Sequence, residues 1–251
     1  MSVALVETWL PRHLFDVDEY ERMREFGVLR SSDRVELLEG LIVDSTGRIP
    51  EGGRLPRESR AMDAVPDSWI PFHRFTVDEY YRMAQIGVLA EDARVELIEG
   101  EIIDMAPIGS WHCGTVGWLT ELFMLGVRQH TNVWTQGVVR LSPFSEPQPD
   151  VMLLKRREDF YRHAHPGAAE TLLVVEVSDS SLRNDQMVKI PLFAHFGVPE
   201  VWIVDGVHET VHFYRAPSGG EYTEVSSTDQ PGVVALASLP DVKVNLTDLF
   251  G

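Results

Sequence analysis

The chain has 251 residues, 44% of them hydrophobic, which is enough to bury the core of one large domain or of one domain with an appendage. Its net charge of −17 argues against a generally basic nucleic-acid-binding surface, because phosphate binding draws on lysine and arginine. A single cysteine excludes an intramolecular disulfide framework, and no apolar run reaches membrane-spanning length. The N-terminus lacks the pattern of a signal peptide, so a cytoplasmic protein without a membrane partner is expected.

The N-terminal part of the chain contains a repeat. Residues 11–44 (copy one) align without a gap with residues 71–104 (copy two), and 20 of the 34 positions are identical. Residues 45–69 between them are rich in Gly, Pro, Ser and charge, which is typical of a linker. We therefore predict an accessory helix–hairpin repeat over 1–44, a linker over 45–69 and a catalytic domain over 70–251.

Each copy is predicted to begin with a helix and to continue into a β-hairpin. Asp16 and Thr76 are good N-caps, and each is followed three residues later by a glutamate, the spacing of a capping box. In copy two the hairpin strands flank a two-residue turn at Glu99 and Gly100.

The hairpin of copy two places two acids on one face. A turn at Glu99 and Gly100 sets Glu96 opposite Ile103 and Glu101 opposite Ile98, and opposed residues project from the same side. An apolar face that bears two acids is expected to point toward a site. The alternative is that Glu96 pairs with an arginine such as Arg94 or Arg140.

A helix is predicted from about Trp111 to Gln129, with His112 on its apolar stripe and at the end nearest the preceding loop. His112 could position a water or a phosphate oxygen there. The alternative is a satisfied core histidine, which is the more common fate of a lone histidine on an apolar face.

Two short apolar runs further along the chain each carry one carboxylate. Asp150 starts the run that follows Pro149, and Glu176 lies near the end of the run from Thr171 to Ser178. Lys189 follows in a predicted helix, and the strand–helix–strand unit that contains it should be a parallel crossover. Buried carboxylates are costly without partners. Two carboxylates and an ammonium at strand ends suit a hard divalent cation and a water that it activates.

The ordered segments of residues 71–250 resemble a known family. They include FTVDEYYRM, RVELIEGEIIDMAP, the His112 helix, QPDVMLL, LLVVEVSDSS and KIPLFAHFGVPEVWIVD. Together they resemble the Uma-type (Uma-two) restriction endonuclease family of the PD-(D/E)XK nuclease superfamily. Ser178 stands where the superfamily pattern has lysine, and Lys189 matches the lysine that the Uma-type pattern places in the next helix.

The resemblance implies an α+β fold, with a restriction-endonuclease-like core in which helices flank a mixed sheet, preceded here by the repeated helix–hairpin. It implies a Mg²⁺- or Mn²⁺-dependent endonuclease that acts on DNA. In that interpretation Asp150, Glu176 and Glu101 hold the metal, while Lys189, Glu96 and His112 complete the catalytic site. Two alternatives remain: a non-catalytic interaction protein on this fold, and a hydrolase of a small phosphodiester. Copy one is expected to lie at the periphery or against a partner subunit, and a symmetric homodimer contact is one way to cover its apolar face.

Overall fold

The computed structural model describes residues 11–45, 72–179 and 181–251, which fall into two compact units. Unit 1 contains the described residues up to Met105 together with Ser142–Glu146, and unit 2 contains the remainder. The predicted linker lies outside the described residues apart from Ser45. The predicted boundaries at 44 and 70 stay a prediction. Among the described residues, no helix is both long and apolar enough to cross a membrane.

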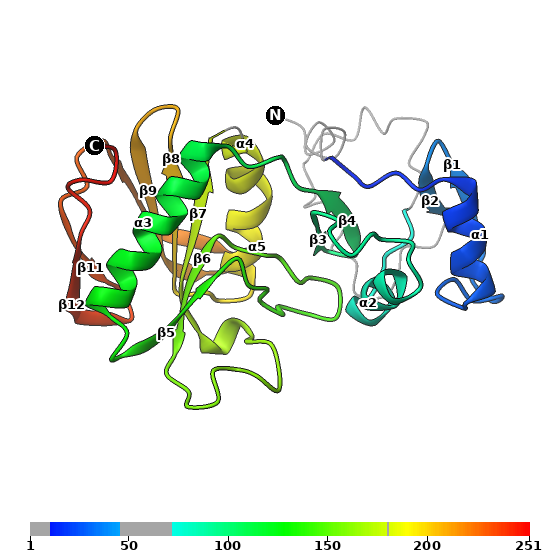
Figure 1. The fold of residues 1–251 in the computed structure, drawn as a ribbon, viewed down its shortest axis with the longest axis horizontal. Coiled ribbons are helices and arrows are strands. Elements are labelled where there is room, and N and C mark those ends of the chain that lie inside the picture. The colour runs from blue at the N-terminus through cyan, green and yellow to red at the C-terminus, as the bar shows by residue number, and fades with distance from the viewer. Residues whose placement is uncertain (1–10, 46–71, 180) are drawn as a thin grey trace. The chain divides into compact units, whose positions relative to one another are not determined.

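Unit 2 is built on a six-stranded mixed sheet (Figure 1). Its spatial order is β10 (Glu221–Thr228), β9 (Thr210–Ser218), β8 (Glu200–Asp205), β7 (Thr171–Ser178), β6 (Val151–Lys155) and β5 (Thr131–Thr135). The pair β7–β8 is parallel, and the other neighbours are antiparallel. The predicted parallel crossover between β7 and β8 is therefore confirmed.

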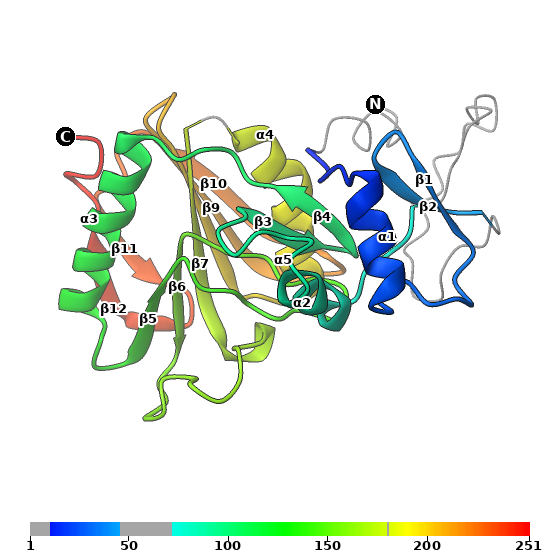
Figure 2. The same cartoon turned by 45° about the vertical axis from the view of Figure 1, so that its right-hand side comes forward.

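Helices cover both faces of this sheet, as Figures 1 and 2 show. Helix α3 (Ser110–Gly126) packs its apolar stripe on one face, with the hairpin of β11 (Val233–Leu236) and β12 (Leu239–Asn245) beside it. Helix α5 (Ile190–His195) packs on the other face. Strand β7 is apolar almost throughout because it is central and buried on both sides.

A buried carboxylate links strands β8 and β9 to the hairpin of β11 and β12. Glu200 is fully buried, and its two oxygens accept three hydrogen bonds. The donors are Trp202 Nε1 at 2.8 Å, Arg215 Nε at 2.6 Å and the backbone N–H of Ala237 at 2.7 Å. This carboxylate therefore links β8, β9 and the loop between β11 and β12.

We expect Glu200→Ala to destabilise unit 2 by about 3 kcal/mol, because it leaves the Arg215 charge and two other donors without their acceptor. Urea unfolding monitored by tryptophan fluorescence measures the loss. Glu224→Ala, which removes an exposed acid from β10, serves as the control and should change the free energy of unfolding by less than about 0.5 kcal/mol. Equal stability of the two variants would contradict the role of Glu200.

Unit 1 contains two helix–hairpins at matching positions of the two copies. Copy one forms α1 (Val17–Glu25), β1 (Val35–Leu38) and β2 (Leu41–Asp44), and copy two forms α2 (Val77–Gln85), β3 (Val95–Ile98) and β4 (Glu101–Asp104). Both predicted capping boxes are present. The predicted register of the second hairpin is confirmed, with Glu96 opposite Ile103 and Ile98 opposite Glu101.

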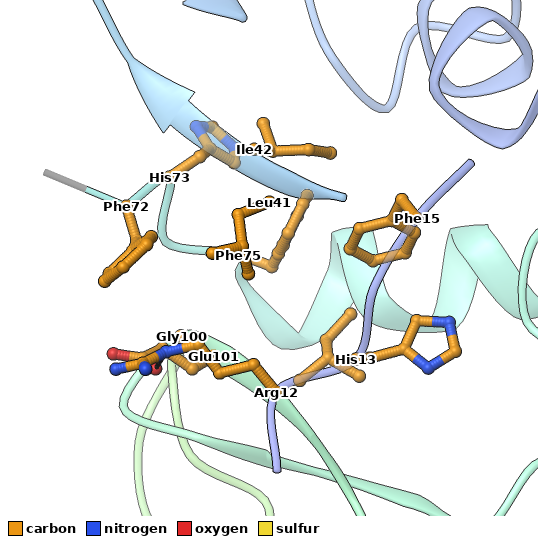
Figure 3. A pocket seen from close by; sticks show the side chains of 11 residues that line it. Arg12, His13, Phe15, Leu41, Ile42, Phe72, His73, Phe75, Gly100 and Glu101 are labelled. Atoms are coloured by element: carbon orange, nitrogen blue, oxygen red, sulfur yellow. Dashed lines mark hydrogen bonds and ion pairs between the residues drawn. The ribbon is translucent and has the colours of Figure 1, made fainter. Parts of the chain in front are cut away.

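The two copies share a core and exchange backbone hydrogen bonds reciprocally. Arg12 pairs with Ile103 of β4, and Phe72 pairs with Val43 of β2, each in an antiparallel bridge. These two pairs are equivalent at the offset of sixty residues. The segment before each helix therefore extends the hairpin of the other copy. Phe15 and Phe75 pack edge to face, with their ring centroids 5.9 Å apart. Figure 3 shows both rings in the small hollow between the copies.

The exchange is chemically asymmetric. Where copy one supplies Arg12, the hairpin of copy two supplies Glu101, and these side chains form an ion pair. At the equivalent place on the other side, Phe72 faces a hairpin that carries Leu41. One side of the exchange therefore carries a charge pair, whereas the residues at the equivalent positions on the other side, Phe72 and Leu41, are both apolar.

A half-buried histidine beside the exchange makes the stability of unit 1 sensitive to acid. His73 packs against Phe75, and its Nε2 is buried with no hydrogen-bond partner among the described residues. Burial lowers the pKa of His73 below its usual value of 6.5. As the pH falls below 6.5, the unfolded chain therefore binds more protons than the folded chain. The stability that depends on neutral His73 is fully present above that pH and is lost below it.

We expect His73→Phe to lose less stability than the wild type between pH 7.5 and pH 5, because the ring stays but the proton-binding group is gone. Urea unfolding at the two pH values measures the difference. His163→Ala, in which an exposed histidine is removed, should retain the pH dependence of the wild type. An unchanged pH dependence in His73→Phe would contradict the assignment.

Candidate active site

The first group of site residues lies where β6 begins. Asp150 precedes β6, and its Oδ2 accepts the backbone N–H of Val177 at 2.8 Å, across from β6 on β7. Its Oδ1 lies 2.9 Å from Nε2 of His112, in the first turn of α3. Because an ionised carboxylate can only accept, His112 donates this bond. His112 is thus neither a free base nor a purely apolar contact: it holds the Asp150 carboxylate in place.

The second group lies on β7 and on the helix that follows it. Glu176 is buried, and Nζ of Lys189 lies 3.3 Å from its Oε1. Lys189 also lies 3.9 Å from Oδ1 of Asp185, whose other oxygen accepts the hydroxyl of Ser181 at 2.8 Å. All three charged groups are buried, so the ammonium is held between two carboxylates in a site of low polarity.

The path of the chain explains why Lys189 reaches Glu176. Residues Asp185–Lys189 form one turn of π-helix, η3, between α4 (Leu182–Asn184) and α5. The N–H of Ile190 donates to the carbonyl of Asp185, five residues earlier. Pro191 then occupies the first turn of α5, where a missing N–H is tolerated. Helix α5 thus begins one residue before the proline, and the widened turn that precedes the helix sets the direction of Lys189.

The two groups belong to neighbouring strands. The β6–β7 register pairs Val151 with Val175, so one further step sets Asp150 across from Glu176. No cluster of three or more His, Cys, Asp or Glu suited to a metal ion occurs within the described ranges. The donor set on these strands is instead two carboxylates. That set fits Mg²⁺, which is commonly held by one or two carboxylates together with water and substrate phosphate.

The remaining predicted acids lie in unit 1. Glu96 is buried on β3 and Glu101 is half-buried on β4. Glu101 is engaged by Arg12, which comes from copy one. Their predicted roles in catalysis and metal binding stay predictions.

Sequence reasoning missed Asp185 as a site residue. Its spacing of four residues from Lys189 was the available signal, because residues at i and i+4 lie on one side of a helix.

The basic run after β6 is largely used in contacts within unit 2. Arg156 donates to the carbonyl of Arg128 at 2.8 Å, and Arg157 binds both oxygens of Asp159, at 2.9 and 2.6 Å. This hydrogen-bonded pair raises the pKa of Arg157 and lowers the pKa of Asp159. The geometry supports a structural role for these two arginines in an exposed loop.

Comparison with known proteins agrees with this fold. A putative nuclease belonging to DUF820 from Anabaena variabilis ATCC 29413, known from a crystal structure, matches with a TM-score of 0.55 and 20% sequence identity. The match covers 70% of this chain and 97% of that one, so unit 2 has the mixed α+β architecture of a nuclease-like fold. No curated protein matches.

The family is shown by its sequence model, which matches residues 77–247 and is described as "Putative restriction endonuclease". The matched range begins in the first turn of α2 and ends after β12, so it contains Asp150, Glu176, Lys189 and His112, whereas copy one precedes it. The chain therefore belongs to the Uma2 family of restriction endonuclease-like proteins.

Proposed function

We propose that the protein is a Mg²⁺- or Mn²⁺-dependent endonuclease that hydrolyses phosphodiester bonds of DNA. The observation that carries the proposal is the pair of buried carboxylates, Asp150 and Glu176, on adjacent strands with the buried ammonium of Lys189 against one of them. Membership of a restriction endonuclease family supports the same chemistry.

Asp150 and Glu176 would hold the cation. When bound, the ion lowers the pKa of a water and polarises the scissile phosphate. His112 orients Asp150 by its 2.9 Å hydrogen bond, and the N–H of Val177 fixes the second oxygen, so the carboxylate is held before any ligand arrives. This preorganisation means that little of the binding energy is spent on ordering the side chain.

Lys189 would act on the substrate. Its amine is held by Glu176 and Asp185 in a buried position, where a positive charge interacts strongly with charge that develops on the phosphate oxygens. Asp185 keeps Lys189 directed at Glu176 through the π-turn. Glu96 and Glu101 are proposed as further contributors, Glu101 toward the metal.

Fewer observations bear on the substrate than on the reaction. DNA is the substrate class that the family indicates. One observation favours a small phosphodiester as the second candidate: Arg156 and Arg157, in the densest basic run, are engaged by other groups of unit 2. Cleavage of plasmid DNA and of a small chromogenic phosphodiester, measured side by side, separates the two.

We expect Asp150→Asn to reduce metal-dependent cleavage of plasmid DNA on the order of 10²- to 10³-fold, because the amide keeps the shape of the side chain and removes its charge. The rate is measured with and without Mg²⁺ or Mn²⁺. Asp241→Asn, which removes an exposed charge from β12 in the same unit, is the control and should retain activity. Wild-type cleavage that persists in chelator, or full activity in Asp150→Asn, would contradict the proposal.

Lys189→Met should lower turnover by a similar factor while metal binding stays the same or becomes tighter. The methionine fills the buried space of the lysine stem, and its neutral sulfur leaves Glu176 without a competing cation. Calorimetric titration with Mn²⁺ and single-turnover cleavage report the two effects separately. Loss of Mn²⁺ binding in a variant with wild-type circular dichroism would remove Lys189 from the proposed role.

A further inference from the structure

A short segment of the chain docks on copy two. Residues Ser142–Glu146 lie against α2 and the outer edge of β3, where Leu97 and Glu146 form an antiparallel bridge. Three backbone hydrogen bonds hold the segment: Val77 N–H to Pro143 at 2.8 Å, Gly100 N–H to Phe144 at 2.6 Å, and Glu146 N–H to Leu97 at 2.8 Å. The segment therefore extends the hairpin by strand addition and caps the first turn of the helix.

The side chains of this segment are also bound. The guanidinium of Arg74 lies over the Phe144 ring, 4.9 Å from its centroid. The Ser145 hydroxyl accepts the N–H of Glu99 at 2.9 Å. The acid at the end of the segment, Glu146, accepts the hydroxyl of Tyr81 at 2.6 Å. Copy two thus recognises four successive residues by backbone and side chain together.

Copy one offers the same backbone groups. Sixty residues earlier the donors and acceptor correspond to Val17, Glu39, Gly40 and Leu37. The turn has the same shape, with φ of 52° at Glu39 and 81° at Gly40, against 50° and 86° in copy two. Within the part of the chain that the structure describes, no segment pairs with the outer edge of β1.

The corresponding side chains on copy one are exposed. Val17 is 65% exposed, whereas its counterpart Val77, which donates to Pro143, is 3% exposed. Leu14 and Leu38 beside it are 60% and 42% exposed. Leu14 lies against the turn at Gly40, as Arg74 lies against the turn at Gly100. An apolar patch therefore adjoins an open strand edge, and this combination is a template for pairing.

We propose that this edge of copy one is a docking site for a short extended segment of a partner protein, in which an aromatic residue is followed two positions later by a basic residue. Leu14 replaces Arg74 and still packs against an aromatic ring. Glu21 replaces Tyr81, so the position filled by Glu146 on copy two needs a cation on copy one. The site lies outside the range matched by the family and does not depend on the proposed nuclease activity.

The same charge argument excludes the segment of a second copy of this chain as the preferred occupant. Its Glu146 would lie against Glu21, and like charges in this position repel. The sign of the charge at one position of the segment, the one that faces Glu21, therefore distinguishes the partner from the segment bound by copy two. This makes the proposal testable as a switch of charge preference.

The test uses the full chain and two fluorescein-labelled peptides, Gly-Ser-Pro-Phe-Ser-Lys-Gly and the same peptide with Glu in place of Lys. Fluorescence anisotropy should give a dissociation constant on the order of 10⁻⁴ M for the lysine peptide, as befits a short flexible ligand. The glutamate peptide should bind about fivefold more weakly or worse. Glu21→Lys should reverse this order, and Glu91→Lys, which makes the same charge change at an exposed position of copy two, should not.

A second variant removes the backbone contact. Val17 is the first residue of α1, a position where proline is favoured, so Val17→Pro deletes one N–H donor without disturbing the helix. It should weaken the lysine peptide at least threefold, while circular dichroism stays that of the wild type. No binding to the wild type at millimolar peptide, an unchanged preference in Glu21→Lys, or undiminished binding in Val17→Pro would each overturn the proposal.

Discussion

The contact between Lys189 and Glu176 is the interaction on which the architecture of unit 2 depends. Strand β7 is central and apolar, and a lone carboxylate within it would be very costly. The strand therefore needs a cation delivered from the helix that returns to the sheet. The π-turn at Asp185–Lys189 delivers it at 3.3 Å, and Asp185 shares the ammonium. The parallel crossover between β7 and β8 thus brings together a buried acid and its counter-ion.

Under the proposed function, this arrangement would also separate the tasks of the two acids. The Asp150 carboxylate is fixed by Nε2 of His112 and the N–H of Val177, whereas Glu176 is fixed by the ammonium of Lys189. A cation bound by both acids would meet them in different surroundings, because an imidazole lies against Asp150 and a lysine ammonium against Glu176. In the proposed function, binding of the cation and retention of Lys189 would therefore be coupled through Glu176, and the ammonium would respond to charge on a phosphate.

Local signals made much of this fold predictable from sequence. The capping boxes follow from Asp16 and Thr76, and the turn at Glu99 and Gly100 fixes the hairpin register, because both depend on residues three or fewer positions apart. The π-turn was not predicted, since it arises from tertiary packing of Lys189 and from Pro191 rather than from a periodic pattern. The bond between His112 and Asp150 joins residues 38 positions apart, and no spacing rule reveals it.

The reciprocal exchange in unit 1 was beyond sequence reasoning for the same reason, but it gives meaning to the substitutions between the copies. Positions that keep the hairpin shape, such as Gly40 and Gly100, are identical, while positions on its edges differ in charge. Arg12 against Glu101 selects one pairing of the copies, and Glu21 against Tyr81 gives their outer edges different preferences. Two copies with the same backbone shape can therefore pair with each other through one hairpin edge and bind different segments at the other edge. Side-chain charge, rather than the fold, decides which segment a strand edge binds.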